Sequence, residues 1–200
     1  MSDQRHSIAQ AVSLEGIGLH LGRACRLTFR PAEAGTGVVF RRVDLSGEPS
    51  IPARADFAVL SDRRTQLGSG PAALHTVEHV LAAVAAQDID DLVIEMDGPE
   101  PPILDGSAAP YFDALGRAGI ADRGGAVQYL AVTRPMSVKC GESMYEVLPA
   151  PSLSLKVTID FPHPLIGRQT LDMGVTRDSF ARELAGARTF GFTREVEMLS

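Results

Sequence analysis

The first half of the chain changes from a strand-like to a helix-like spacing of its hydrophobic residues. Two early segments, 25–29 and 38–43, are rich in β-branched and aromatic residues, which is typical of strands. Between Thr76 and about Gln87, apolar residues recur at helical spacing in an alanine-rich run. We therefore predict strands followed by a helix that buries one face, with Thr76 as its N-cap.

A second passage from strand to helix follows. Residues 92–96 form a short apolar run, and an Asp-Gly turn then leads into a proline-rich loop. Ser107 is suited to cap a helix that runs to Arg117, because Gly119 stands just past its end. We predict a strand, a loop and a second helix in this order.

The second half of the chain repeats this order of elements. The polar, glycine-containing stretch 121–125 has the composition of a linker, so we place a domain boundary after residue 123. Residues 152–161 alternate between polar and apolar side chains, as expected of a strand with one buried face. The predicted elements are strands near 128–132, 136–139, 145–148 and 153–161 and a helix at about 176–184.

These two successive units predict an α+β fold of two similar domains, residues 1–123 and 124–200. Each would be a β-sheet layered with helices, in the manner of a duplicated sandwich. The second unit breaks off without a helix stop or a polar tail, so we expect this domain to be incomplete.

Charge and cysteine content narrow the classes of function. The net charge of -6 does not favour a nucleic-acid binder, whose affinity comes from Lys and Arg that neutralise phosphates. Most basic residues are Arg, which suits bidentate recognition of one or two phosphates in a small ligand. Cys25 and Cys140 are the only cysteines and lie far apart, which argues against a disulfide scaffold and a cysteine-based metal site. Any metal would be held by His and carboxylates.

The sequence shows neither a membrane-spanning segment nor an export signal. No stretch approaches the roughly 20 apolar residues needed to span a bilayer. Asp3, Arg5 and Gln10 interrupt the region where an export signal needs an apolar segment. We therefore expect a cytoplasmic protein without stable membrane insertion.

The clearest chemical pattern is the run from His75 to His79, which has the spacing H-x-x-E-H. On a helix, two His four residues apart share a face, and the adjacent Glu78 can act as a base, as in metal hydrolases. A first helical turn also disfavours a protonated imidazole, and a metal requires a neutral one. The alternative is structural: Glu at a helix start is favourable by itself, and the His would contact only backbone or solvent.

Two further segments carry no chemistry by themselves. Residues 105–110, DGSAAP, supply a turn, a helix cap and small residues that allow close packing. Residues 188–192, RTFGF, place a hydroxyl between an arginine and two aromatics, which suits a site with polar and apolar parts. An edge strand with phenylalanines in the core is the commoner meaning of so short a pattern.

The segments become more informative when they are read together. In order, the chain contains GIGLH, RPAEAGTGVVFRRVD, HTVEHVLAAV, DIDDLVIEMDGPEPPILDGSAAPYF, TIDFPHP and ARTFGF. This series closely resembles the UDP-3-O-acyl-N-acetylglucosamine deacetylases, and the resemblance runs from about Ile8 to Leu199.

The resemblance implies a zinc-dependent deacetylase that acts on a UDP-linked acyl amino sugar in the committed step of lipid A synthesis. His79 would be a zinc ligand and Glu78 the general base, whereas His75 lies outside the ligand set of the family. A catalytic zinc takes about three protein ligands and a water. Attack of that water on the acetyl carbonyl of the 2-acetamido group would release acetate and a free amine.

The resemblance also implies roles for residues of the second half. Thr189 matches a threonine whose hydroxyl helps to hold the oxyanion. Phe190 and Phe192 match aromatics that line the passage for the acyl chain. Asp160 and Phe161 match positions near the uridine.

Two features depart from the family pattern. Ser143 stands near the position of a lysine that some members use at the phosphates, so one of the arginines would have to substitute. The other two zinc ligands of the family, a His and an Asp four residues apart, and the His that protonates the leaving amine would lie beyond Ser200. We therefore expect the 200-residue chain alone to be inactive or nearly so, and to be a monomer.

Two other functions stay open at this point. A metallopeptidase of the H-x-x-E-H type would bind its metal through both His75 and His79. A nonenzymatic module would keep a surface for a nucleotide sugar or an acyl chain without a metal centre. Zinc loss in a His75→Ala variant would identify the first, and UDP-sugar binding without zinc binding would identify the second.

Overall fold

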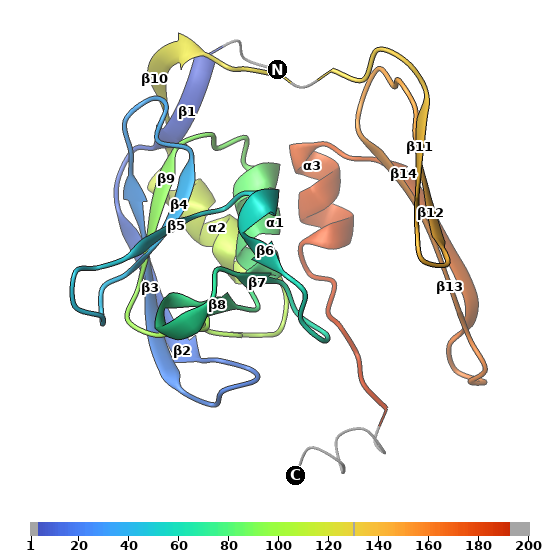
Figure 1. The fold of residues 1–200 in the computed structure, drawn as a ribbon, viewed down its shortest axis with the longest axis horizontal. Helices are drawn as coiled ribbons and strands as arrows, with labels where there is room; N and C mark the ends of the chain where they lie inside the picture. Colours follow the sequence, from blue (N-terminus) through green and yellow to red (C-terminus); the bar gives the residue numbers. More distant parts are fainter. Residues whose placement is uncertain (1–3, 130, 193–200) are drawn as a thin grey trace. The chain divides into compact units, whose positions relative to one another are not determined.

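The computed structural model describes residues 4–129 and 131–192 of the chain (Figure 1). Its internal contacts form two units. The first unit joins Met1–Val127 to Phe180–Ser200, and the second is Gln128–Ser179. Each unit is described by itself.

The first unit is built on a five-stranded sheet with the strand order β2-β3-β9-β4-β5. Neighbouring strands are antiparallel except β4 and β9, which run parallel. In β3, Cys25, Leu27 and Phe29 are buried, because every second side chain of a strand points to the same face. The strands are β2 (Val12–Ile17), β3 (Ala24–Pro31), β4 (Val38–Arg42), β5 (Ser50–Pro52) and β9 (Leu92–Met96).

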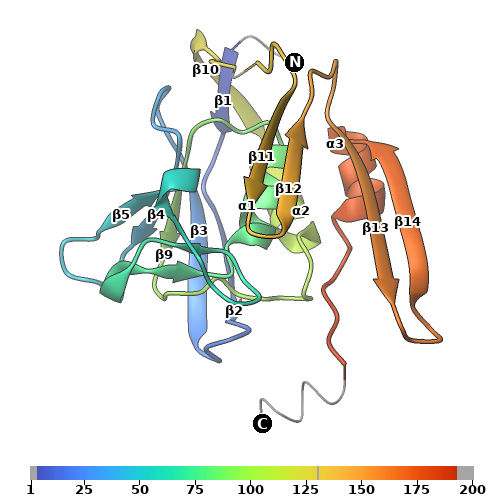
Figure 2. The same ribbon diagram turned by 45° about the vertical axis from the view of Figure 1, so that its right-hand side comes forward.

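Two helices lie on one side of this sheet (Figures 1 and 2). They are α1 (Glu78–Ala86) and α2 (Ala109–Ala118), and they contact each other. The apolar faces of the helices and the sheet form one core. Its fully buried side chains include Leu27, Phe29, Phe40, Leu74, Val80, Ile94, Tyr111 and Leu115.

Smaller elements complete the first unit. β1 (Gln4–Ile8) pairs with β10 (Ile120–Ala126), and a π-helical turn, Phe180–Leu184, places Phe180 against Phe112. A three-stranded sheet consists of β6 (Ala58–Val59), β7 (Gln66–Leu67) and β8 (Leu74–His75), and 3₁₀ turns occupy Ala55–Phe57 and Gly70–Ala72.

The second unit consists of two antiparallel hairpins and the short helix α3 (Arg177–Ser179). Their side chains are largely exposed: Leu153 is 60% and Val157 48% accessible. The hairpins join β11 (Met136–Cys140) to β12 (Ser143–Val147) and β13 (Ser154–Phe161) to β14 (Gly167–Gly174).

The structure confirms the α+β class and most of the predicted strands. The predicted linker 121–125 is wrong, because these residues belong to β10 and pair with β1. No strand occurs at residues 128, 129, 131 and 132. On the face of 152–161 that was predicted to be buried, Leu153 and Val157 are exposed and Leu155 and Ile159 are only half-buried. The predicted helix 176–184 is split into α3 and the π-helical turn. The domain boundary after residue 123 stays a prediction.

None of the helices in the two described stretches is long and apolar enough to cross a membrane. The longest of them, α2, has 10 residues. A bilayer requires about 20.

Candidate functional site

The first two residues of α1 are Glu78 and His79, and both are half-buried. The backbone N–H of Thr65 donates a hydrogen bond of 3.0 Å to Oε2 of Glu78. This bond fixes the carboxylate and leaves Oε1 of Glu78 and the imidazole of His79 without a hydrogen bond among the described residues. A carboxylate at this position also interacts favourably with the positive end of the helix dipole. The helix start thus holds a half-buried carboxylate and a half-buried imidazole at adjacent positions.

Thr76 is not the N-cap that the sequence predicted. Val77 occupies that position and makes no side-chain capping bond. Thr76 has a φ of 56°, which lies in the left-handed region that β-branched residues rarely adopt. Its hydroxyl donates to Oε1 of Glu100 at 2.7 Å instead of accepting from a helix amide. The hydroxyl of Thr76 therefore binds a buried carboxylate and does not cap the helix.

Glu100 is a residue of this region that the sequence reasoning missed. It is only 2% exposed and accepts hydrogen bonds from Thr76 and from the backbone N–H groups of His20 and Leu21. Burial raises the pKa of Glu100, but these hydrogen bonds outweigh it, so the net pKa is lowered. The available signal was a lone carboxylate between prolines in the segment PEPP. Through Glu100 the segments GIGLH, PEPP and HTVEH meet beside α1.

His75 lies in β8 rather than on α1, and its backbone N–H donates to the carbonyl of Pro99 at 2.9 Å. The prediction that the two imidazoles of H-x-x-E-H share a helix face is therefore wrong. Burial, followed by the charge of Arg64, lowers the pKa of His75, so its imidazole is neutral at neutral pH. Its Nδ1 is buried without a hydrogen-bond partner among the described residues.

The segment from Arg188 to Phe192 is not a strand, so the edge-strand alternative is wrong. Phe190 is 54% exposed, and its ring packs edge-to-face on Phe192 with centroids 6.0 Å apart. A Cβ added to Gly106 would lie 3.5 Å from Cδ of Arg188, so the segments DGSAAP and ARTFGF are neighbours. No hydrogen bond joins Thr189 to the start of α1 in the described part of the chain.

Asp160 and Phe161 lie at the end of β13 in the second unit. Asp160 accepts a hydrogen bond of 3.3 Å from the guanidinium of Arg168 across the hairpin, and both side chains are exposed. Ser143 is also exposed, at the first position of β12. The proximity of Asp160 and Phe161 to the uridine stays a prediction.

The cluster of ligands that a zinc ion needs is not present in the described ranges. Within residues 4–129 and 131–192, no three His, Cys, Asp or Glu side chains lie close enough to hold a metal. His79 could supply one ligand, whereas a catalytic zinc takes about three from the protein. A zinc site therefore cannot be built from these residues alone.

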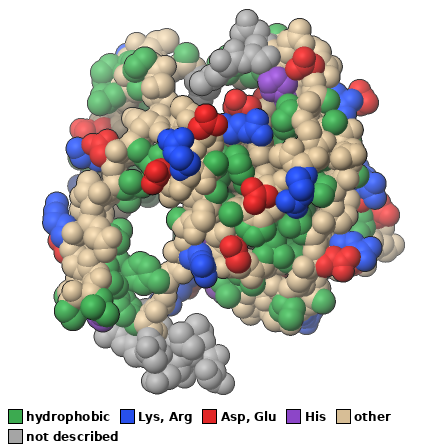
Figure 3. All heavy atoms as spheres, turned by 180° about the vertical axis from the view of Figure 1, so that it is seen from behind, with side chains coloured by type: hydrophobic (Ala, Val, Ile, Leu, Met, Phe, Trp, Pro, Cys, Tyr) green, Lys and Arg blue, Asp and Glu red, His purple; other side chains and the backbone are tan. Residues whose placement is uncertain are grey.

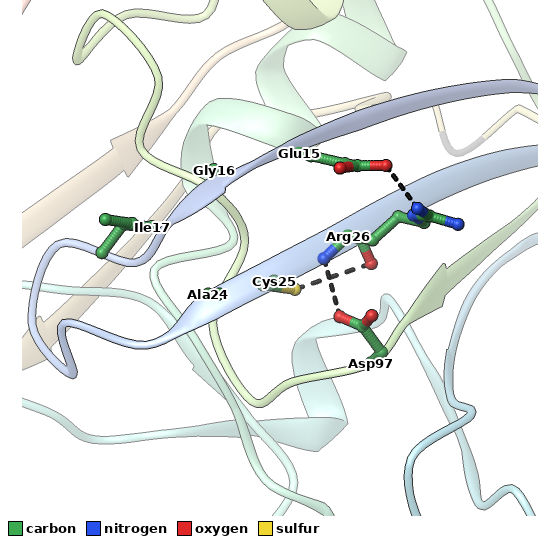
Figure 4. A pocket seen from close by; sticks show the side chains of 7 residues that line it. All are labelled: Glu15, Gly16, Ile17, Ala24, Cys25, Arg26 and Asp97. Carbon is green, nitrogen blue, oxygen red and sulfur yellow. Dashed lines mark hydrogen bonds and ion pairs between the residues drawn. The ribbon is translucent and has the colours of Figure 1, made fainter.

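A hollow of about 520 Å³ lies elsewhere in the first unit and contains none of the predicted site residues (Figure 4). Its charged groups satisfy one another: Arg26 pairs with Glu15 at 2.6 Å, and its backbone N–H donates to Asp97. Burial, then the charge of Asp97, raises the pKa of Cys25 to about 12, so this thiol is not a nucleophile at neutral pH. The lining residues are Glu15, Gly16, Ile17, Ala24, Cys25, Arg26 and Asp97.

Charges of both signs also lie side by side on the face of the molecule shown in Figure 3, with hydrophobic side chains between them. Opposite charges are also paired on the five-stranded sheet, where Glu95 forms ion pairs with both Arg30 and Arg41. The carboxylate and imidazole at the start of α1 differ from these groups, because neither makes an ion pair with another residue that the structure describes. The fold and this site together define an α+β protein with a carboxylate and an imidazole at adjacent positions of a helix start.

Comparison with known proteins identifies the family. The family model described as LpxC, UDP-3-O-acyl N-acetylglycosamine deacetylase, matches residues 5–200. Proteins named UDP-3-O-acyl-N-acetylglucosamine deacetylase are 44% identical over 193 residues in Bdellovibrio bacteriovorus and 42% identical over 198 residues in Myxococcus xanthus. These alignments cover 96% and 99% of the chain but 64% and 63% of the two relatives. The chain belongs to the UDP-3-O-acyl-N-acetylglucosamine deacetylase family and spans less than two thirds of the length of these relatives.

Proposed function

We propose that the protein carrying this chain hydrolyses the 2-acetamido group of UDP-3-O-acyl-N-acetylglucosamine to a free amine and acetate, in the committed step of lipid A synthesis. Family membership supports this proposal, as do the names of the relatives. The structural observation that carries it is the half-buried carboxylate of Glu78, held by the N–H of Thr65 beside His79.

The residues of this chain would act on water and on the substrate carbonyl. Glu78 keeps one oxygen on the Thr65 N–H, and the other would accept the proton of the attacking water. The hydroxyl of Thr189 would donate a hydrogen bond to the oxyanion that forms on the acetyl carbonyl. We further propose zinc as the cofactor, with His79 as one ligand and the others from outside the described residues. A bound zinc ion would polarise the acetyl carbonyl and lower the pKa of the attacking water.

Other parts of the chain would recognise the two ends of the substrate. Phe190 and Phe192, whose rings already contact each other, would line the passage for the acyl chain. Asp160 and Phe161 would contact the uridine from the second unit. We propose that the protein is a cytoplasmic monomer whose complete fold is a duplicated sandwich of sheet and helices.

The test is acetate release by the full-length gene product with UDP-3-O-acyl-N-acetylglucosamine as substrate. A Glu78→Gln variant keeps an oxygen for the Thr65 N–H but cannot take a proton, so kcat should fall by about 10²- to 10⁴-fold with little change in KM. His79→Ala should lose zinc, whereas His75→Ala should retain it.

Two results would contradict the proposal. Full turnover in both the Glu78→Gln and His79→Ala variants would show that Glu78 is not the base and that His79 is not a required zinc ligand. Loss of zinc in His75→Ala together with peptide hydrolysis would favour the metallopeptidase.

A further inference from the structure

Glu100 is a buried carboxylate that accepts every hydrogen bond it makes with the described residues. Oε1 accepts from the hydroxyl of Thr76 at 2.7 Å and from the N–H of His20 at 3.0 Å. Oε2 accepts from the N–H of Leu21 at 2.8 Å and from the N–H of His20 at 3.1 Å. An amide would offer only one acceptor oxygen in place of two, so it could keep the bonds from His20 and Leu21 but not accept from all three donor groups with both atoms. The surroundings of Glu100 therefore select a carboxylate.

The backbone at Gly18 approaches Glu100 so closely that a side chain is excluded. A Cβ added at Gly18 would lie 2.5 Å from Oε2 and 2.9 Å from Cδ of Glu100. The φ of Gly18 is not positive, so glycine is required here by the contact and not by the backbone conformation. Gly18, the second glycine of GIGLH, thus allows the loop Gly18–Leu21 to lie close to this carboxylate.

On its other side, Glu100 holds a strained residue directly before α1. Thr76, with a φ of 56°, lies two residues before Glu78. A β-branched residue in this conformation persists only when its surroundings impose it, and such residues cluster at functional sites. The Thr76 side chain is buried, and its hydroxyl bond to Glu100 is its only side-chain hydrogen bond in the described part of the chain.

We propose that Glu100 is a positioning residue that clamps the loop Gly18–Leu21 to Thr76 and so fixes the direction in which α1 presents Glu78 and His79. The catalytic consequence rests on the function proposed above. The clamp itself does not, because it is a property of hydrogen bonds within the first unit. Glu100 is 2% exposed, so it acts through Thr76 and the loop and not on the substrate.

The catalytic test compares four variants of the full-length gene product. Thr76→Val removes the hydroxyl bond and Glu100→Gln weakens the acceptor set, and kcat should fall on the order of 10- to 100-fold with little change in KM, since small displacements of catalytic groups are this costly. Thr76→Ser keeps the hydroxyl and should restore most of the rate. Glu95→Gln is the matched control, because this carboxylate binds Arg30 and Arg41 on the sheet and should leave kcat unchanged.

The clamp is also tested without any substrate, by hydrogen exchange of the backbone amides. In Glu100→Ala and in Gly18→Ala, exchange of the His20 and Leu21 amides should accelerate at least about tenfold, because their acceptor is lost or displaced. Gly174→Ala is the matched glycine control, since an added Cβ there meets nothing within 4 Å.

The outcomes separate this inference from the proposed function. If the wild-type protein releases no acetate, the proposed function fails, and the exchange data still decide the clamp. If the wild type is active and Glu100→Gln and Thr76→Val match Glu95→Gln in kcat, the positioning role is overturned. Unchanged exchange at His20 and Leu21 in Glu100→Ala would overturn it as well, whatever the activity.

Discussion

Individual carboxylates in this protein are kept charged in buried places by N–H donors, and Asp91 shows this most fully. It is completely buried and accepts from Nε and Nη2 of Arg5 at 2.7 and 2.8 Å and from the N–H of Gly37 at 2.7 Å. Burial raises the pKa of Asp91, but the hydrogen bonds from Arg5 and Gly37 outweigh it and the net pKa is lowered. This carboxylate joins β1 to the segment between β3 and β4.

The lowered pKa of Asp91 predicts a pH-dependent contribution to stability. A carboxyl group whose folded pKa lies below its ordinary value of 3.8 stabilises the fold fully above that value and loses this effect as the pH falls through the folded pKa. Asp91→Asn should therefore lower the free energy of unfolding by up to about 3 kcal/mol at pH 7. The difference from the wild type should shrink below pH 3.8.

Urea unfolding of both proteins from pH 7 down to pH 2.5 or so measures this difference. A deficit that stays constant, or grows, in acid would show that Asp91 is not the titrating group. Asp172→Asn is a useful reference, because Asp172 pairs with Lys156 on the surface with 61% of its side chain exposed. Exposed pairs contribute about 0–1 kcal/mol, so this variant should be close to the wild type at every pH.

The strands of the five-stranded sheet bury one face of apolar side chains, whereas the apolar side chains of the second-unit hairpins are more exposed. Ile94 in β9 is fully buried, whereas Val157 in β13 is 48% exposed. We expect Ile94→Ala to cost about 2–5 kcal/mol of unfolding free energy in the 200-residue chain. Val157→Ala should change it by no more than about 0.5 kcal/mol. Thermal or urea unfolding of the two variants checks the contrast, and equal losses would contradict it.

Local sequence patterns predicted three strands: β-branched and aromatic residues predicted β3, a short apolar run predicted β9, and alternation predicted β13. These patterns did not predict β10 or β14, since β10 contains Gly124 and Gly125 and both strands are rich in polar residues. β10 exists because its backbone pairs with β1 more than 100 residues earlier in the chain. Local patterns carry no information about such a partner.

For the whole molecule, the number of zinc ligands that the chain supplies determines the zinc content and the activity that we expect. The described residues hold no group of three candidate ligands, and His79 is the single ligand that we propose. After dialysis against metal-free buffer, the 200-residue chain should therefore retain far less than one zinc per chain and release almost no acetate. The full-length gene product should retain about one zinc per chain and be active.

Metal analysis and acetate assays on the two purified proteins decide this prediction. Stoichiometric zinc and robust turnover in the 200-residue chain would show that its own residues complete the site. A correctly folded first unit in the 200-residue chain, seen as protected amides in β3 and β9, is the necessary control.

The sequence by itself determined the features that depend on neighbouring residues. The adjacency of Glu78 and His79 is covalent, and the segments from GIGLH to ARTFGF were sufficient to indicate the family that the comparisons show. The helix after Val77 also follows from local spacing, but the predicted capping by Thr76 was wrong.

Only the tertiary structure decided which distant groups meet at the helix start. Glu100 binds the amides of His20 and Leu21, about 80 positions earlier in the chain, and the hydroxyl of Thr76, which has a positive φ. The same packing placed His75 in a strand and set Arg188 against Gly106. Spacing along the chain cannot show such contacts, because a buried carboxylate takes its donors from whatever backbone the fold brings to it.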